Sequence, residues 1–211
     1  MPKTTRSIEE VDAVRERILD YAIKILEKHG YESLSMAKLG AKMNMTAANL
    51  YNYYINKDEL LIAIHKKTYA RLYDEIRSSV KKTDSPLQRI RSIINAFVKF
   101  GTRNVNIYDV MFNRPIKQHS DYIGTPLEKI SEDEFHNSLK ALTFTVKTVK
   151  DYRKTKPDLK PVDEELLAIK IISALHGVIS LHNSGVLHQV SGNTDLVLKK
   201  IVDDIIQSIT K

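Results

Sequence analysis

Apolar side chains recur every three or four residues along most of this 211-residue chain, and this period limits the fold more than any other feature. Val14, Ile18 and Ile25 mark one apolar face of a helix over 12–29, and Gly30 stands where a helix C-terminal glycine belongs. No segment alternates convincingly at every second residue. The sequence therefore predicts an all-α protein, with further helices over about 35–43, 46–53, 58–80, 86–101, 104–113, 126–155, 162–183 and 194–210.

Capping residues divide the segment that follows the first helix. Ser35 and Thr46 are suited to helix N-termini, because their hydroxyls accept hydrogen bonds from free backbone N–H groups. Asn44, between them, tolerates the left-handed conformation of a tight turn. Asn56 and Glu59 fit a capping box that opens the next long helix. Three helices, the last two joined by a tight turn, form a helix-turn-helix.

Residues 15–64, RERILDYAIKILEKHGYESLSMAKLGAKMNMTAANLYNYYINKDELLIAI, resemble the N-terminal DNA-binding domain of TetR-family transcriptional regulators. The resemblance rests on the His-Gly-Tyr end of the first helix, the Ser-Met-x-x-Leu-Gly start of the second, the Thr-x-x-x-Leu-Tyr core of the third and the Asn-Lys-Asp-Glu-Leu-Leu start of the fourth. YDVMFNRP (108–115) and ISALHGVISL (172–181) resemble the ligand-binding domain of many members. Asn44 replaces the family's usual glycine, and Ala47 replaces a frequent Lys or Arg.

The resemblance implies two domains. Residues 1–57 would be the helix-turn-helix domain, with a flexible arm over about 1–10, and residues 58–211 a larger helical effector-binding and dimerisation domain. The implied function is a transcriptional regulator, by family default a repressor, that binds a palindromic operator in double-stranded DNA as a homodimer. A small, mostly apolar effector would release it. The alternatives are an effector-independent architectural or cell-division DNA-binding protein on the same fold, and a regulator-like protein whose main role is protein binding.

The stretch TAANLYNYYINK (46–57) is expected to read DNA. On a helical wheel, Leu50 and Tyr54 point inward, while Ala48 and Asn52 point outward. Asparagine pairs bidentately with adenine and an alanine methyl meets the thymine methyl, so this face is expected to read A·T pairs. The residues expected to contact bases or phosphates are Ser35, Thr46, Ala47, Ala48, Asn49, Tyr51, Asn52 and Lys57, with weaker contacts from Lys38 and Lys42 and from Lys3 and Arg6 in the arm. The alternative is that Tyr51, Tyr53 and Tyr54 are core and boundary aromatics and that Lys38 and Lys42 lie on an ordinary solvated face.

The last two helices are apolar on more than one side, and a helix with two apolar faces needs two packing partners. The resemblance implies that they form a four-helix dimer interface with a symmetry mate, which places two recognition helices about 34 Å apart. The predicted interface residues are Ile169, Ile172, Ile179, Leu198, Ile201 and Ile205.

The resemblance also implies a pocket for the effector. Its predicted lining is Phe97, Tyr108, Met111, Phe112, Phe135, Leu139 and His176. The alternative for each apolar residue is plain core, and for His176 a hydrogen-bonded core or interface histidine.

Composition restricts the remaining classes of function. The net charge of +7 suggests an anionic partner but specifies no site. Zero cysteines exclude disulfides, thiol catalysis and cysteine metal clusters, and none of the common phosphate-loop, hydrolase or zinc-protease motifs is present. His176, His182 and His188 recur every six residues, which does not put them on one helical face. We therefore expect no enzyme, metal or cofactor. Without a signal peptide or a run of about 20 apolar residues, the chain is expected to be cytoplasmic and not to bind membranes.

Overall fold

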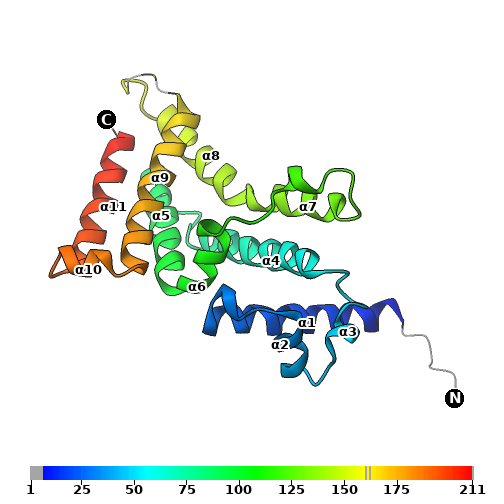
Figure 1. Cartoon of the computed structure of the whole chain (residues 1–211). Coiled ribbons are helices and arrows are strands. Elements are labelled where there is room, and N and C mark those ends of the chain that lie inside the picture. Colours follow the sequence, from blue (N-terminus) through cyan, green and yellow to red (C-terminus); the bar gives the residue numbers. More distant parts are fainter. Residues whose placement is uncertain (1–6, 160, 162, 211) are drawn as a thin grey trace, which may run out of the picture. The chain divides into compact units, whose positions relative to one another are not determined.

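The computed structural model describes residues 7–159, 161 and 163–210, and Lys3 and Arg6 of the predicted arm lie outside these residues. Helices account for nearly all of the regular structure, and the described part contains no β-strand, which confirms the all-α prediction. The α-helices, shown in chain order in Figure 1, are α1 (Ile8–His29), α2 (Met36–Lys42), α3 (Ala47–Leu50), α4 (Lys57–Ser78), α5 (Pro86–Arg103), α6 (Val105–Tyr108), α7 (Glu128–Ser138), α8 (Lys140–Lys154), α9 (Glu164–Asn183), α10 (Val186–Val190) and α11 (Thr194–Thr210). Short 3-10 turns span Tyr31–Ser33 and His119–Tyr122, and a π-helical turn spans Asp109–Asn113.

The chain divides into two compact units. The first comprises residues 7–69 and 106–137 of the described chain, and the second comprises residues 70–105 and 138–210. Helix α4 begins in the first unit and ends in the second. The predicted boundary at residues 57 and 58 does not coincide with this division, because the first half of α4 and the segment 106–137 belong to the same unit as the helix-turn-helix. The functional division into DNA-binding and effector-binding domains stays a prediction.

Local capping signals fix several helix ends. Ser7 and Glu10 form a capping box that starts α1 at Ile8, so residues 8–10, predicted as the end of a flexible arm, are helical. Gly30 ends α1 with φ 74°, as its position predicted. Ser85 and Gln88 form a second capping box at the start of α5.

One predicted helix is wrong. The segment 126–155 was expected to be continuous, but α7 ends at Ser138 and α8 begins at Lys140. Asn137 is buried, and its side-chain Nδ2 donates a hydrogen bond of 2.7 Å to the backbone oxygen of Lys66 in α4. This long-range bond links the last turn of α7 to α4, and no proline or glycine in the sequence marks the break. The short helix α10, which Gly185 precedes in a left-handed conformation, was also not predicted.

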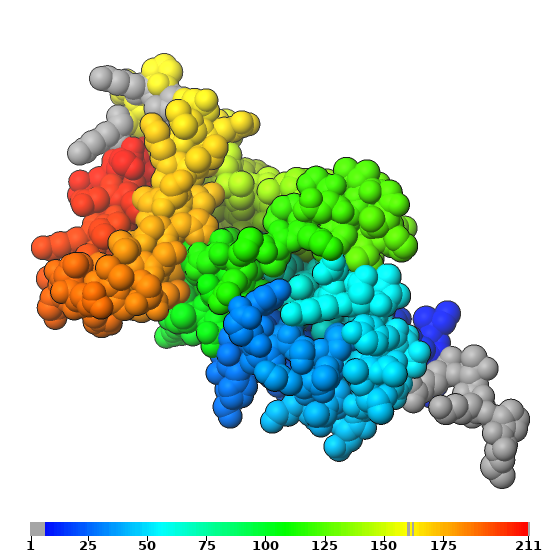
Figure 2. All heavy atoms as spheres, viewed as in Figure 1, coloured from blue at the N-terminus to red at the C-terminus, as the bar shows by residue number. Residues whose placement is uncertain are grey.

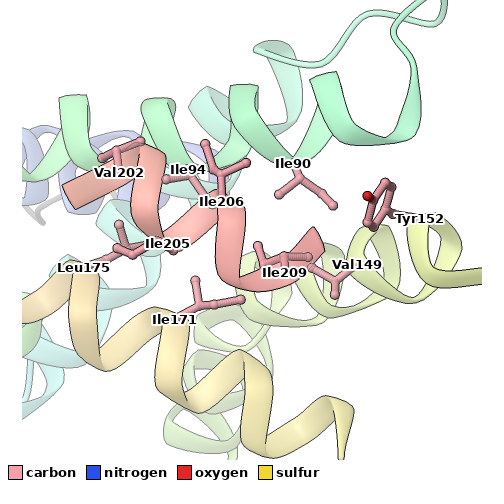
Figure 3. Close-up of a cluster of buried hydrophobic side chains, with 10 residues drawn as sticks. All are labelled: Ile90, Ile94, Val149, Tyr152, Ile171, Leu175, Val202, Ile205, Ile206 and Ile209. Atoms are coloured by element: carbon pink, nitrogen blue, oxygen red, sulfur yellow. The ribbon is translucent and has the colours of Figure 1, made fainter. Parts of the chain in front are cut away.

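The core of the second unit is a cluster of ten buried side chains from α5, α8, α9 and α11, which face one another in Figure 3. They are Ile90, Ile94, Val149, Tyr152, Ile171, Leu175, Val202, Ile205, Ile206 and Ile209. The same helices pack pairwise, α5 against α8 and α9, and α9 against α11. The C-terminal helices therefore bury one apolar face within their own chain.

Candidate nucleic-acid interface

The turn between α2 and α3 brings two backbones into close approach. Asn44 adopts φ 54°, the left-handed conformation that the sequence predicted for it. Met45 N–H donates to the backbone oxygen of Gly40 at 2.9 Å. A Cβ atom added to Gly40 would lie 2.6 Å from the backbone oxygen of Met45. Glycine is therefore required at residue 40, a role that the motif in the sequence did not reveal.

Side-chain hydroxyls cap both helices of the motif. Ser35 Oγ accepts a hydrogen bond from Lys38 N–H at 3.2 Å, and Thr46 Oγ1 accepts one from Asn49 N–H at 3.1 Å. These bonds confirm both residues as N-caps. The α-helix that Thr46 starts is only four residues long, and the chain continues as turns through Asn56 instead of the predicted helix to Tyr53.

Residues 46–57 are called the recognition segment below. Burial divides their side chains into an inward and an outward set. Leu50, Tyr53 and Tyr54 are buried, as the alternative interpretation held for the last two. The exposed residues are Thr46, Ala48, Asn49, Tyr51, Asn52, Ile55 and Asn56, and Ala47 is half-buried. Asn52 Nδ2 donates to Asn49 Oδ1 at 3.4 Å, so the two asparagines form one polar group on the surface. Figure 2 shows the segment 36–56, in the light-blue to cyan range, at the surface of the molecule.

The end of the recognition segment is held by an arginine and a glutamate. Arg15 Nη2 donates to Glu59 Oε1 at 2.7 Å, and Arg15 Nη1 donates to the backbone oxygen of Tyr53. Glu59 Oε2 accepts from Ile55 N–H at 2.6 Å, while Glu59 N–H donates to Asn56 Oδ1 at 2.8 Å. The predicted capping role of Asn56 is confirmed, but the carboxylate caps Ile55 instead of Asn56.

Tyr54 also takes part in holding the segment, and Arg15, Glu59 and Tyr54 are together called the anchor below. The Arg15 guanidinium lies 4.3 Å from the centre of the Tyr54 ring, and the Tyr54 hydroxyl donates to the backbone oxygen of Arg15 at 3.1 Å. Burial raises the pKa of Tyr54 to about 12, so its hydroxyl stays protonated and keeps donating. Sequence reasoning missed Arg15, because no local spacing links residue 15 to residues 53–59.

The charge of this surface is neutral to basic. No acidic residue occurs from Ser33 to Lys57, and Lys38 and Lys42 are exposed on α2. Lys57 is half-buried, and its ammonium lies 4.8 Å from the centre of the Tyr31 ring. The candidate interface therefore has an uncharged outward face with cationic groups at its margin. This arrangement suits contact with DNA, where lysines at the margin pair with phosphates and the uncharged face meets the bases.

The known proteins that this chain resembles point to one family. The model for "Bacterial regulatory proteins, tetR family" matches residues 18–64, which contain α2, the turn and α3. Residues 18–64 are therefore a tetR-type DNA-binding segment by sequence. This confirms the resemblance found in the sequence, and the family and the curated relatives are transcriptional regulators and not enzymes.

Two curated relatives of the family show how far the sequence similarity extends. The HTH-type transcriptional repressor KstR of Mycobacterium tuberculosis is 26% identical over 97 residues, which is 46% of this chain and 44% of that protein. The HTH-type transcriptional activator FasR of Mycolicibacterium smegmatis is 24% identical over 115 residues, 54% of this chain and 50% of that protein. The chain thus spans about half the length of the curated relatives it matches.

The fold similarity covers the whole chain. A solved structure of a protein of unknown function from Rhodococcus sp. RHA1 covers 100% of both chains with a TM-score of 0.75 and 20% sequence identity. The fold similarity therefore extends beyond the segment that the family model matches.

The residues predicted for the effector pocket fall in both units. Tyr108, Met111, Phe112 and Phe135 belong to the first, and Phe97, Leu139 and His176 to the second, where the Phe97 and His176 rings meet edge to face at 5.7 Å. Phe135 and Leu139 are exposed, while Tyr108 and Met111 are buried. The second unit also has an open cavity of about 460 Å³ between α4 and α5, lined by Glu75, Ser78, Ser79, Ser92, Asn95, Ala96 and Lys99. None of the predicted pocket residues lines this cavity, and the predicted apolar pocket stays a prediction.

Two of the residues predicted for the dimer interface are wrong. Ile179 is 0% exposed and Ile205 is 8% exposed within a single chain, and Ile205 is part of the core shown in Figure 3. A side chain that is already buried in its own core has no surface to offer a partner. Ile172, Leu198 and Ile201 are half-buried, and Ile169 is 58% exposed.

Proposed function

We propose that this chain is a transcriptional repressor that binds a palindromic operator in double-stranded DNA as a homodimer and is released by a small, mostly apolar effector. The observation that carries the proposal is the exposed, uncharged face of α3 and the turn after it, held on a buried anchor inside the segment that matches the tetR family. Such a face fits the major groove, where sequence is read by hydrogen bonds to base edges. Acting on DNA in a bacterial cell, the protein would work in the cytoplasm.

Direct base contacts are proposed for Ala47, Ala48, Asn49 and Asn52. Because Asn52 donates to Asn49, the pair leaves an amide N–H group and a carbonyl oxygen free to match adenine N7 and N6. Phosphate contacts are proposed for Ser35, Thr46, Tyr51 and Lys57, which flank the reading face.

Replacing Asn52 with alanine is expected to weaken binding to the selected operator by about 1–3 kcal/mol, or roughly fivefold to 150-fold, with little change for random DNA. Random-site selection identifies the operator, and fluorescence anisotropy at two salt concentrations then measures the affinity for the operator and for random DNA. Asn95→Ala, on the exposed surface of α5, is the matched control and should bind the operator normally. A selected site with only G·C pairs beneath α3 would contradict the assignment of base contacts.

Exposed apolar residues on α9 support the proposed dimer. Leu166, Ile169 and Leu181 are 47%, 58% and 46% exposed, although the helix has a mean hydropathy of 1.4. By length and composition α9 is the one described helix that qualifies as a membrane span, and only 28% of its apolar window is buried. A second copy of this helix would cover the exposed face and remove it from water, as the family's dimers require.

Gly177 marks the point where the partner helix is expected to cross. It lies in the interior of α9, where glycine costs about 1 kcal/mol relative to alanine, and a Cβ there would contact nothing within 4 Å. Nothing within the described chain explains this glycine, whereas close approach of a second helix would.

Substituting leucine for Gly177 is therefore expected to weaken the dimer by at least about tenfold in dissociation constant while leaving the subunit folded. Sedimentation equilibrium measures the association, and far-ultraviolet circular dichroism checks the helix content. Thr143→Leu, exposed on α8, adds a comparable side chain outside the proposed interface and should leave the dimer unchanged. A monomeric wild-type protein at micromolar concentration, or a Gly177→Leu dimer as tight as wild type, would argue against this interface.

A further inference from the structure

Two acidic residues mark the ends of the acid-free stretch that contains the recognition segment. Glu32 precedes this stretch and Asp58 follows it, and no Asp or Glu occurs between them. A carboxylate beside a DNA-binding face opposes the approach of phosphates, because like charges repel. The contacts that Glu32 and Asp58 make therefore bear directly on how strongly this face binds DNA.

Both carboxylates form ion pairs with one short segment far along the chain. Arg114 Nη1 donates to Glu32 Oε1 at 2.9 Å, and Lys117 Nζ donates to Asp58 Oδ2 at 2.6 Å. The partners are 82 and 59 positions apart in the sequence, and all four residues belong to the first unit. The segment lies in the connection between α6 and α7, which is green in Figure 1, and Pro115 restricts its backbone. One segment thus neutralises both acids.

A second carboxylate fixes the guanidinium of Arg114. Arg114 Nε donates to Asp109 Oδ2 at 2.7 Å, and Asp109 begins the π-helical turn that ends at Asn113. The side chain of Asp109 is 33% exposed, whereas that of Glu32 is 81% exposed. An arginine can serve two acceptors at once, because its planar guanidinium presents five N–H donors. The less exposed Asp109 therefore holds Arg114 where it reaches Glu32.

Lys57 is the cation that this arrangement leaves available. Its ammonium lies 4.8 Å from the centre of the Tyr31 ring, and the Arg114 guanidinium lies 5.5 Å from the same centre. Among the described residues Lys57 has no ion-pair partner, and the neighbouring Asp58 is paired with Lys117. A cation on an aromatic ring keeps its charge and can still meet an anion. Lys57 thus combines a defined position with an unpaired charge.

We propose that Arg114 and Lys117 are positioning residues of the DNA interface. By pairing with the two acids, they leave the Lys57 ammonium to a DNA phosphate. Without Lys117, the Asp58 carboxylate competes with the phosphate for Lys57 and repels the DNA backbone. The role of these residues rests on the proposed function, through the phosphate contact of Lys57. It brings the segment 109–117 into DNA binding, although the sequence placed these residues in the effector-binding domain.

Charge rescue tests the role of Lys117. Lys117→Gln frees the Asp58 carboxylate and is expected to weaken binding to the operator and to random DNA alike, by about fivefold at about 0.1 M salt. Both DNAs are affected because a phosphate contact carries no sequence information. The double variant Lys117→Gln/Asp58→Asn removes both charges and is expected to bind within about twofold of wild type. Fluorescence anisotropy of the full chain with each labelled duplex measures these affinities.

Lys66→Gln is the matched control for the lost positive charge. Lys66 pairs with Asp133 at 3.3 Å in the same unit, and both residues lie outside the recognition segment. The variant should bind both DNAs within about twofold of wild type. If Lys117→Gln binds as well as Lys66→Gln, the proposal is overturned. It is also overturned if Asp58→Asn does not restore binding to the Lys117→Gln variant, because Lys117 then contacts a phosphate directly.

The dependence of binding on salt reports whether Lys57 reaches a phosphate. Each neutralised phosphate contributes about −0.9 to the slope of log K against log salt concentration, and partial unfolding alone leaves this slope unchanged. Lys57→Gln is expected to make the slope less negative by about 0.9 for each subunit. Lys117→Gln and Tyr31→Leu are expected to share part of this change, whereas Tyr31→Phe keeps the ring and should keep the slope. A wild-type slope in Lys117→Gln would overturn its positioning role, even if binding were weaker.

The positioning role and the proposed function fail separately. Normal operator binding with no effect of Lys117→Gln would remove only the positioning role. Salt-dependent binding of random DNA without a preferred operator would remove the proposed repressor, while charge rescue on random DNA would still decide the role of Lys117. A wild-type protein that binds no DNA would remove both.

Discussion

Alanine in place of Gly40 is expected to destabilise the protein by about 1–3 kcal/mol and to abolish high-affinity operator binding. In an ordinary helix interior, replacing glycine with alanine stabilises the protein by about 1 kcal/mol. At residue 40 we expect the opposite, a loss of stability. The reason is the 2.6 Å separation between an added Cβ and the Met45 backbone oxygen, with Thr46 C at 3.3 Å. These are backbone atoms at the start of α3, and they move only if the recognition segment moves.

Urea unfolding monitored by circular dichroism measures the stability of the Gly40→Ala variant, and fluorescence anisotropy measures its operator affinity. Gly192→Ala is the matched control, because a Cβ there meets nothing within 4 Å and should change stability by less than about 0.5 kcal/mol. A Gly40→Ala protein that is as stable as wild type and binds the operator normally would show that α2 and α3 separate easily.

The second large effect is expected for Glu59→Ala. The substitution removes the acceptor of two short hydrogen bonds, from Arg15 at 2.7 Å and from Ile55 N–H at 2.6 Å. Glu59 is 8% exposed, and breaking such a pair from one side leaves its partners without compensation. A loss of about 2–3 kcal/mol in stability is expected, together with weaker operator binding, because the freed segment follows α3 directly.

Two further variants separate the contribution of the anchor from that of any helix charge. Glu75→Ala removes a half-exposed partner of Arg71 on the same helix, at 3.2 Å, and is expected to cost only about 0.3–0.5 kcal/mol. Glu59→Gln keeps a neutral acceptor and should fall between Glu59→Ala and wild type in both measurements. If Glu59→Ala resembled Glu75→Ala, the anchor would not position the recognition segment.

The helix-turn-helix could be predicted because its signals are local. Ser35, Asn44 and Thr46 act through atoms within three residues of themselves, so their identities indicate the two caps and the left-handed turn. Leu50 and Tyr54 are buried, as the helical wheel indicated, although regular helix stops at Leu50. A mid-helix glycine at residue 40 was the available signal for the close approach of α2 and α3.

The features that escaped prediction depend on long-range contacts. Arg15 anchors residues that follow it by 38 to 44 positions, and Asn137, in the last turn of α7, donates to a carbonyl in α4. Ile179 and Ile205 repeat with the same period as an interface stripe, but both are buried within the chain, Ile205 in the core that α5, α8, α9 and α11 form. Periodicity identifies an apolar face without saying which neighbour covers it.

The amino-acid sequence by itself determined the helical class, the helix-turn-helix with its caps, the tetR-type motif and the uncharged outward face of residues 46–57, because each depends on residue type and short spacing. The tertiary structure alone decided which atoms hold that face, why Gly40 is required, and how the chain divides into two units. These properties arise when side chains distant in the chain meet in a closely packed interior, where a contact or an unpaired atom depends on distances that no local pattern encodes.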